Sequence, residues 1–417
     1  MNRLTISNGY DIIRISAEDI KMKKTLVINL SLLPLLFIFF FSCRKKSSLS
    51  VPNEHSDEYS YQIPEQTDDG WETVSLSDVR IDEAPIIDLV DAIRNEEYSE
   101  VHGIVIVKEG KLVFEEYFPG HLFSINEANY HGSVVHYNRN IWHNTHSATK
   151  SITSALVGIA IDKGFIGDVN GKIFNYFVDY TLLSNAEKDK ITIKHLLTMT
   201  SGLEWNEWDV TPGNSEWDQE IFNNSVDPVG YLLAKPVVTE PGTNFYYNGG
   251  GVDLLGEIIR IASDGIRIDD FSDQYLFEPL GITHYEWQRL RSIICAHGDI
   301  YLRPRDMAKF GTLFLNNGVW NGSRIISEDW VKESTESYIS LSNLHLSWAD
   351  SYGYLWWLKT YHCNNQTYDS FKALGWGGQE IIIFPGLDMV VVFTGANYAV
   401  DPPCDEILVR YILPAVL

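Results

Sequence analysis

The stretch from Asn144 to Gly164 carries the clearest hydrophobic pattern in the chain. Its apolar positions recur at the spacing of one helix face: Ile152, Ala155, Leu156, Ile159 and Ala160. Lys163 and Gly164 follow as a helix stop. The pattern predicts a helix with one side packed against the rest of the fold.

Two pairs of short apolar runs predict β-hairpins at opposite ends of the globular region. Residues 102–118 contain two runs joined by Lys108 to Lys111, and residues 381–384 and 389–393 flank a Pro-Gly turn. The patterns between them, at 165–290, are mostly helical. We therefore predict an α/β (α+β) fold: one antiparallel sheet completed by both ends of the chain, flanked by helices, with an inserted all-helical region at about 163–290.

Shorter periodic stretches predict further elements. Helical spacing occurs at 84–94, 191–205, 327–333 and 404–413, a helix and a turn are expected at 303–322, and a strand at 353–358. Residues 121–140 form a polar insert. Residues 204–217 are rich in tryptophan and acidic residues without periodicity, and we leave open whether they cover a cleft or pack internally.

The N-terminal region has the layout of a secretory signal. Residues 1–21 resemble an upstream extension, whereas Met22 starts a segment with two lysines and an apolar run from Leu26 to Phe41. The run ends at Ser42-Cys43, which resembles the cleavage box of bacterial lipoproteins, where the cysteine is lipidated. An uncleaved anchor and plain secretion are the alternatives. We expect a lipid anchor at Cys43, a flexible tether at 44–75 and a domain at 76–417 on the periplasmic or extracellular side of the membrane.

Composition narrows the possible partners. The 417-residue chain has a net charge of −24, which argues against nucleic acid because a phosphate backbone is bound by a basic face. No two cysteines form a C-x-x-C pair, which argues against a zinc site. With Cys43 used for lipidation, one disulfide and one thiol could remain, with the pair left open, among Cys295, Cys363 and Cys404.

Ser147 and Lys150 are the first candidates for chemistry. They lie three residues apart at the start of the predicted helix and so share a face. A lysine can take the proton of a serine hydroxyl if burial or nearby positive charge lowers its pKa. The helix N-terminus also favours negative charge that develops beside the serine. The same spacing occurs at Ser42–Lys45 without catalytic meaning, so downstream motifs must support the assignment.

Five stretches in order resemble the serine β-lactamase and penicillin-binding protein superfamily, in its class C and esterase-like branch. They are HSATKS at Ser147, ITIKHLLTMTSGL, PGTNFYYNGGGVDLLGEII, RPRDMAKFGTLFLNNGVWNG, and GWGGQ followed by VVVFT. The resemblance covers about residues 80–415. It implies a β-lactamase/transpeptidase-like fold with the serine at a helix start, between the sheet and the helical region.

The resemblance also implies roles for residues in the second motif. Tyr247 matches the motif tyrosine by its spacing to the preceding Pro-Gly and the following Leu-Leu, although a literal Tyr-x-Asn reading selects Tyr246. Tyr247 would share the proton of Ser147 and Lys150. Asn248 is a candidate for contact with the substrate.

The third motif departs from the family pattern. It falls on Ala373-Leu374-Gly375, so its usual basic residue is missing. Gly375 is a candidate substrate-binding residue. The backbone N–H groups of Ser147 and Trp376 would form the oxyanion hole, which does not depend on the missing side chain.

These observations predict a membrane-tethered serine hydrolase that cleaves an ester or amide bond through an acyl-enzyme, without a metal or organic cofactor. The expected substrate is a small molecule or a short peptide. The missing basic residue favours the esterases and 6-aminohexanoate-oligomer amidases of the branch over a β-lactamase or D-alanyl-D-alanine carboxypeptidase. A non-hydrolytic penicillin-binding-type sensor is the alternative from a different class.

Overall fold

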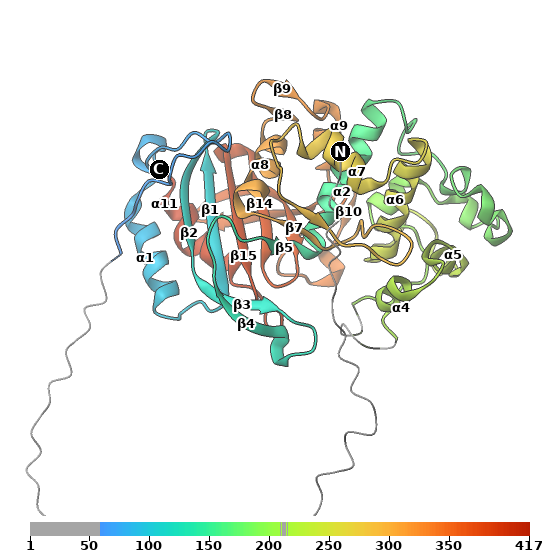
Figure 1. Cartoon of the computed structure of the whole chain (residues 1–417), viewed down its shortest axis with the longest axis horizontal. Coiled ribbons are helices and arrows are strands. Elements are labelled where there is room, and N and C mark those ends of the chain that lie inside the picture. The colour runs from blue at the N-terminus through green and yellow to red at the C-terminus, as the bar shows by residue number, and fades with distance from the viewer. Residues whose placement is uncertain (1–58, 209, 211–213, 215) are drawn as a thin grey trace, which may run out of the picture. The chain divides into compact units, whose positions relative to one another are not determined.

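An antiparallel sheet is the centre of the fold. The computed structural model describes residues 59–208, 210, 214 and 216–417. Its main sheet has eight strands in the order β10-β11-β12-β13-β14-β15-β1-β2 (Figure 1). The first hairpin is β1 (Val101–Lys108) and β2 (Lys111–Tyr117), and the last is β14 (Gln379–Phe384) and β15 (Met389–Gly395). Because β1 pairs with β15, the prediction that both ends of the chain complete one sheet is confirmed.

The remaining strands of this sheet are β10 (Ile339–Ser340), β11 (Ser351–Tyr352), β12 (Trp357–Cys363) and β13 (Gln366–Gly375). The strand predicted at 353–358 is wrong for most of its length. Gly353 donates its N–H to the carbonyl of Trp356 at 2.8 Å, so the chain bends there between two strands. Leu355 has a φ of 61° in this bend, which is uncommon for a residue other than glycine, and the apolar run alone did not reveal it.

Helices cover both faces of the sheet, which explains why β1, β14 and β15 are buried along their whole length. One face packs against α1 (Glu83–Arg94) and the C-terminal helical turns α10 (Cys404–Ile407), η10 (Leu408–Ile412) and α11 (Leu413–Ala415). The other face packs against α2 (Thr149–Asp162) and α8 (Pro304–Leu315). The helices predicted at 84–94 and 404–413 and at the start of 303–322 are therefore confirmed.

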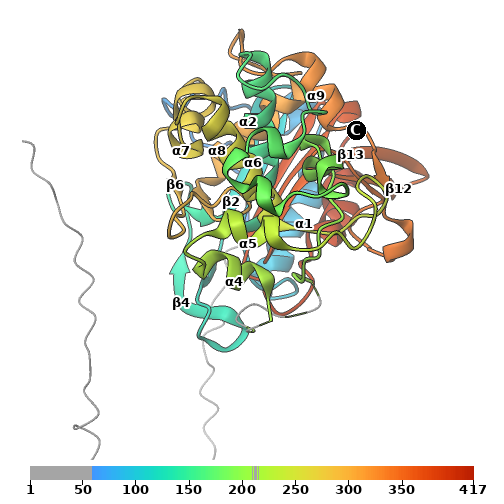
Figure 2. The same ribbon diagram turned by 90° about the vertical axis from the view of Figure 1, so that its right-hand side faces the viewer.

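The inserted region is helical, as predicted, and its elements are short (Figure 2). They are α3 (Ile193–Leu197), α4 (Asp218–Asn224), α5 (Pro228–Ala234), α6 (Gly249–Ala262) and α7 (Ile268–Ser272). The helix predicted at 191–205 is thus much too long. His195 closes a capping box with Thr192 at the start of α3, which is a structural role.

Smaller elements border the sheet and the helical region. β5 (His143–Asn144), β7 (Ile300–Leu302) and β6 (Glu286–Trp287) form a three-stranded sheet, and β8 (Val319–Trp320) pairs with β9 (Ser323–Arg324). The helix predicted at 327–333 is α9 (Glu328–Ser334), capped by Ser327. The polar insert at 121–140 contains a hairpin of β3 (Pro119–Phe123) and β4 (His131–His136), which the sequence pattern did not predict.

The domain begins earlier than predicted. Residues 59–75, which we assigned to a tether, pack against the domain: Tyr59 and Trp71 are buried, and Arg305 binds the Asp69 carboxylate at 2.7 Å and the Glu65 carbonyl at 2.9 Å. The sequence did not predict this packing, because the segment is mostly polar. Only single aromatic residues and Arg305, which is distant in the chain, hold it against the domain.

The described cysteines and helices bear on the predicted disulfide and on the predicted membrane anchor. Cys295, Cys363 and Cys404 are buried free thiols, so none of these three forms the disulfide that we considered. Among the residues that the structure describes, no helix combines the length and apolar character needed to cross a bilayer. The predicted signal and Cys43 lie outside the described residues.

Candidate active site

Ser147 lies in a short 3-10 turn, His146–Ala148, directly before α2 rather than inside its first turn. Side-chain hydrogen bonds hold this turn: the Asn144 side-chain oxygen accepts the His146 N–H at 2.8 Å, and Thr145 Oγ1 donates to the Ile300 carbonyl at 2.9 Å. The Ser147 side chain is half-buried. The turn therefore presents its hydroxyl on a braced backbone.

Lys150 lies one turn further on and is buried, with 2% of its surface exposed. Its Nζ donates to Ser147 Oγ at 3.0 Å and to the His297 carbonyl at 2.7 Å. The same nitrogen lies 4.7 Å from the centre of the Tyr247 ring. The structure thus brings together the three residues predicted to share a proton.

Tyr247 reaches this position from the loop before α6. Asn248 caps that helix, with its side-chain oxygen accepting the Gly251 N–H at 2.8 Å, and so fixes the residue before it. Tyr246, the literal motif match, is 41% exposed and is not the tyrosine beside Lys150. The Asn248 amide nitrogen is buried and has no hydrogen-bond partner in the described part of the chain, and its contact with a substrate stays a prediction.

The charge state of Lys150 differs from the expectation. Burial lowers its pKa, but the Tyr247 phenol and the Glu207 carboxylate outweigh burial and hold the pKa above the ordinary lysine value. The condition named for activating Ser147 directly, a lowered lysine pKa, is therefore not met. In the resting site Lys150 is an ammonium group that donates to Ser147, and a proton must leave before Lys150 can accept one.

Glu207 is a residue that the sequence pattern missed. One of its carboxylate oxygens accepts the Trp205 indole N–H and the Gly249 backbone N–H, both at 2.7 Å. This places a negative charge where α6 begins, close enough to raise the Lys150 pKa. The next residue, Trp208, stacks on Tyr247 with ring centres 5.1 Å apart, so this part of the stretch at 204–217 lies beside the site. The tryptophan and acidic residues of this stretch were the only feature of the sequence that pointed to its place beside the site.

A buried charged pair, Asp253 and His297, lies next to the backbone carbonyl that binds Lys150. Asp253 accepts the backbone N–H groups of Ala296 and His297 at 2.7 and 3.1 Å, and its second oxygen lies 2.7 Å from His297 Nδ1. Burial lowers the pKa of His297, but Asp253 and Cys295 raise it well above its usual value. Asp253, Cys295 and His297 also carry potential metal ligands, but all three side chains are buried, so an ion from solvent does not reach them. We interpret the group as a brace for the carbonyl that binds Lys150.

The end of β13 passes directly against the nucleophile turn. A Cβ atom on Gly375 would lie 2.1 Å from the Thr145 carbonyl and 3.2 Å from the Ala148 nitrogen, so only glycine allows this approach. Trp376 follows at a turn, and its indole N–H donates to the Tyr398 carbonyl at 2.9 Å. The two segments predicted to supply the oxyanion donors are therefore in contact.

The third-motif position carries no charge. Ala373 is buried in the core on the α2 and α8 side of the sheet. The neighbouring Lys372 is fully buried and forms ion pairs with Glu380 at 2.9 Å and Asp405 at 3.0 Å, next to the C-terminal helix. Lys372 is the sole basic residue of β13, so this strand offers no cation to a substrate.

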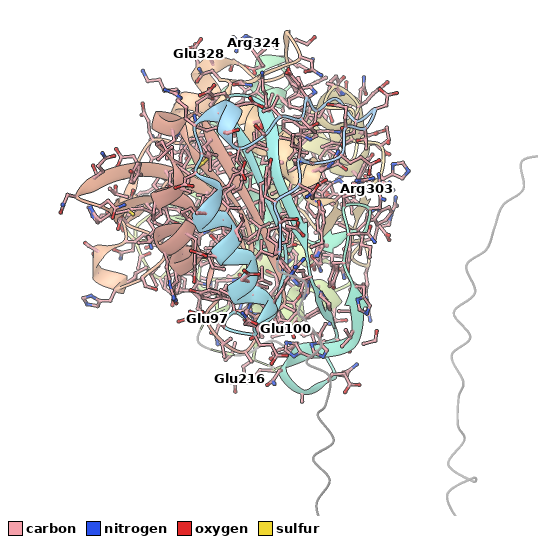
Figure 3. All side chains as sticks on the ribbon, turned by 90° about the vertical axis from the view of Figure 1, so that its left-hand side faces the viewer. Glu97, Glu100, Glu216, Arg303, Arg324 and Glu328 are labelled. Atoms are coloured by element: carbon pink, nitrogen blue, oxygen red, sulfur yellow. The ribbon has the colours of Figure 1, made fainter. Side chains whose placement is uncertain are left out.

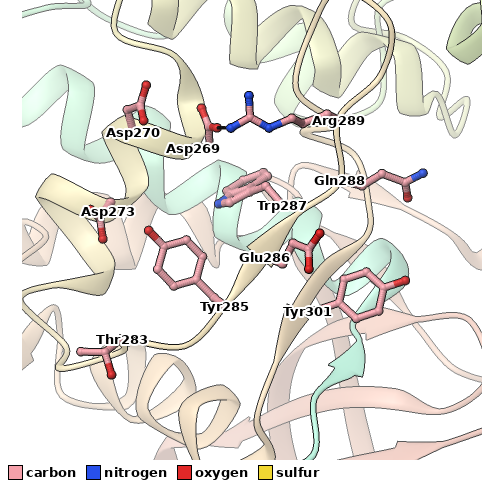
Figure 4. A pocket seen from close by; sticks show the side chains of 10 residues that line it. All are labelled: Asp269, Asp270, Asp273, Thr283, Tyr285, Glu286, Trp287, Gln288, Arg289 and Tyr301. Atoms are coloured by element: carbon pink, nitrogen blue, oxygen red, sulfur yellow. Dashed lines mark hydrogen bonds and ion pairs between the residues drawn. The ribbon is translucent and has the colours of Figure 1, made fainter. Parts of the chain in front are cut away.

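The site is identified by chemistry rather than by cavity size. A cavity of about 870 Å³ lies elsewhere, on the helical region (Figure 4). Its acidic lining is partly neutralised, because Arg289 binds Asp269 at 3.0 Å. None of Ser147, Lys150 and Tyr247 lines it.

Comparisons with known proteins identify the family and the fold. The Beta-lactamase family model matches residues 96–403. An uncharacterised protein of Alkalihalophilus pseudofirmus is 23% identical over 334 residues, covering 72% of this chain and 87% of that protein. The 6-aminohexanoate-dimer hydrolase of Paenarthrobacter ureafaciens is 24% identical over 262 residues, covering 59% of this chain and 64% of the enzyme. The crystal structure of a family VIII carboxylesterase has the same fold, with a TM-score of 0.60 and 17% identity over 80% of this chain and 96% of that one.

Proposed function

The chain belongs to the Beta-lactamase family and is a serine hydrolase, and from this premise we propose that it cleaves ester or amide bonds through an acyl-enzyme on Ser147. The observation that carries the proposal is the 3.0 Å contact between Lys150 Nζ and Ser147 Oγ, with the Tyr247 ring beside the same amine. A serine hydroxyl within hydrogen-bond reach of a buried amine is the arrangement of an activated nucleophile.

Proton transfer starts from a charged lysine. Lys150 and Tyr247 together lose one proton to solvent, and the pair then accepts the Ser147 proton as Oγ attacks the substrate carbonyl. The backbone N–H groups of Ser147 and Trp376 stabilise the oxyanion. The pair returns the proton to the leaving group, which leaves the acyl-enzyme. The pair then accepts a proton from a water molecule as the water attacks the acyl group. The acid is released, and the proton passes to Ser147 Oγ.

The substrate class follows from what the site lacks. β13 presents Ala373 where a basic residue would attract a carboxylate, and Lys372 is committed to the opposite side of the sheet. We propose esters or amides without a carboxylate at that position. Sequence similarity to a 6-aminohexanoate-dimer hydrolase supports this class.

A substrate panel tests the proposal. The full chain, purified in detergent, is assayed with a p-nitrophenyl ester, a short amide, a D-alanyl-D-alanine peptide and a chromogenic cephalosporin. We expect turnover of the ester or the amide and its loss in Ser147→Ala, because the nucleophile is removed. Turnover that survives Ser147→Ala would contradict the assignment, and preference for the cephalosporin would contradict the substrate class.

A non-hydrolytic sensor makes a different prediction for the same protein. It would acylate at Ser147 and hold the adduct, whereas a hydrolase releases it. Intact-mass measurements over time after mixing with penicillin or an ester separate these outcomes. A persistent adduct without product would replace the hydrolase proposal.

We also propose a lipid anchor at Cys43, on the strength of the signal-like segment from Met22 to Phe41 that precedes it. The expected partner is the membrane, with the catalytic domain on its periplasmic or extracellular side. Cys43→Ala should move the protein from the membrane fraction to the soluble fraction. Membrane retention in that variant would favour an uncleaved anchor.

A further inference from the structure

A second cluster of metal-ligating side chains lies outside the catalytic site, where the β3–β4 hairpin meets the main sheet. Glu100 directly precedes β1, and it meets His121 on β3 and His131 at the start of β4. Figure 3 labels Glu100 at the end of the molecule where this hairpin lies. Potential ligand atoms of the three side chains are all within 4.8 Å of one another. We propose that Glu100, His121 and His131 bind a divalent transition-metal ion of the Zn²⁺ type.

Glu100 is held as a charged group aimed at the hairpin. One of its oxygens lies 2.6 Å from His121 Nδ1, while the other accepts the His121 backbone N–H at 3.0 Å and lies 3.3 Å from His102 Nε2. The Glu100 backbone has the left-handed φ of 56°, and its carbonyl accepts the Ala396 N–H at 2.9 Å, which fixes this uncommon conformation.

The two imidazoles are stacked face to face, so one ring must turn before a nitrogen from each faces the same ion. The His121 and His131 rings are nearly parallel, at 3°, with their centres 4.6 Å apart. His131 Nε2 lies 2.9 Å from the Ala396 carbonyl oxygen, an outer partner of the kind that orients a metal-binding histidine. Binding releases the proton between Glu100 and His121, and their ligand atoms must move apart from 2.6 Å to about 3 Å, because each bond to the ion is about 2 Å long. One ring nitrogen of His131 and water complete the coordination.

The ligand chemistry selects the class of ion. Two imidazoles and one carboxylate suit Zn²⁺, Cu²⁺ or Ni²⁺, whereas Ca²⁺ and Mg²⁺ prefer oxygen ligands only. The His121 side chain is 33% exposed and that of Glu100 is 15% exposed, so an ion can reach both from solvent. The cysteine spacing had argued against zinc, and this site arises instead from three residues that folding brings together.

The position of the cluster gives the ion a structural consequence. Phe123 and Tyr130 of the hairpin region pack edge-on against Trp376, with ring centres 5.6 and 4.7 Å apart. An ion shared by Glu100 and both hairpin strands would tie these aromatic residues to the sheet. It would therefore order the rim of the active site without entering the chemistry of Ser147.

Isothermal titration of the tag-free full chain with ZnCl₂, and with CaCl₂ for comparison, tests this site. We expect about one Zn²⁺ per chain and no saturable Ca²⁺ binding. His121→Gln and His131→Gln should each weaken Zn²⁺ binding about tenfold or more. His136→Gln is the matched control, because His136 is an exposed histidine on the same hairpin and should bind as the wild type does.

A second readout separates loss of the site from misfolding. Zn²⁺ should raise the thermal unfolding midpoint of the wild type and of His136→Gln but not of the double variant His121→Gln/His131→Gln, with each shift measured against the same protein without metal. Absence of saturable Zn²⁺ binding, or equal binding in the double variant and the wild type, would overturn the proposal. Failure of either test leaves the Ser147 mechanism untouched.

Discussion

Ser147 lies between two regions that are built from different interactions. On its interior side, Lys150 is fixed by hydrogen bonds to Ser147 and to the His297 carbonyl, with the charge of Glu207 nearby. On its outer side, the rim consists of aromatic edges, with Phe123 5.1 Å from the His146 ring and 5.6 Å from the Trp376 ring. Hydrogen bonds to charges demand exact geometry, whereas aromatic contacts tolerate change.

These two kinds of contact assign proton transfer and substrate selection to different sides of Ser147. Proton transfer depends on the interior, because moving a buried ammonium group by one ångström breaks its hydrogen bonds. Selection among substrates depends on the rim, because aromatic side chains define the shape of the opening. Substitutions on the interior side should therefore change kcat, and substitutions on the rim should change KM.

The largest effect should come from Lys150. Lys150→Met removes the proton acceptor and should lower kcat about 10⁴-fold with an unchanged fold. Lys309→Met is the matched control, since Lys309 is also a buried lysine and binds Asp306 at 3.0 Å. That control should lower the unfolding midpoint and keep kcat. Equal losses of kcat in the two variants would show that burial, not proton transfer, explains the effect of Lys150.

The two adjacent tyrosines should differ sharply. Tyr247→Phe removes the hydroxyl of the ring beside Lys150 and should lower kcat about 10²-fold. Tyr246→Phe alters an exposed side chain and should stay within about twofold of the wild type. Steady-state ester hydrolysis measures both, and the reverse order would transfer the second-motif role to Tyr246.

Glu207 should set the pH dependence. Its charge raises the Lys150 pKa, and the active form has lost a proton from the Lys150–Tyr247 pair, so the rate should increase with pH. Glu207→Gln keeps a hydrogen-bond acceptor but removes the charge. The rise of kcat/KM should then begin at lower pH, while Glu204→Gln, an exposed neighbour, should leave the profile unchanged. A shift toward higher pH would contradict the electrostatic role of Glu207.

The smallest effect should come from the rim. Phe123→Ala removes the ring that contacts Trp376 and His146. We expect KM for a bulky ester to change about fivefold, with kcat for a small ester within about twofold. Kinetics with two esters of different size provide the measurement. A large loss of kcat with the small ester would mean that the rim also positions the catalytic groups.

The sequence predicted those parts of the site whose residues are neighbours in the chain. Ser147 and Lys150 share a helix face, and the flanking spacing selected Tyr247. Glu207 and the His297 carbonyl could not be predicted, because they reach Lys150 only through tertiary contacts, the latter across 147 residues. Tyr247 and Glu207 together raise the Lys150 pKa, and the contribution of Glu207 could not be predicted because its carboxylate comes from elsewhere in the chain.

The fold shows the same division. The hairpins β1–β2 and β14–β15 and the helices α1 and α2 follow from local periodicity and were predicted within a few residues, whereas the long strands β12 and β13 were not predicted. The bend at Gly353 and the early packing of Trp71 against Trp320, with ring centres 5.1 Å apart, depend on distant partners. Periodicity over a short window carries no information about such contacts.

Peptide mapping after reaction with a fluorophosphonate shows whether Ser147 is the nucleophile and whether Lys150 activates it. The wild type should carry one adduct on the Ser147 hydroxyl, Ser147→Ala should carry none, and Lys150→Met should react far more slowly. An adduct on a different residue in the wild type would contradict Ser147 as the nucleophile. Equally fast labelling of Ser147 in Lys150→Met would contradict its activation by Lys150.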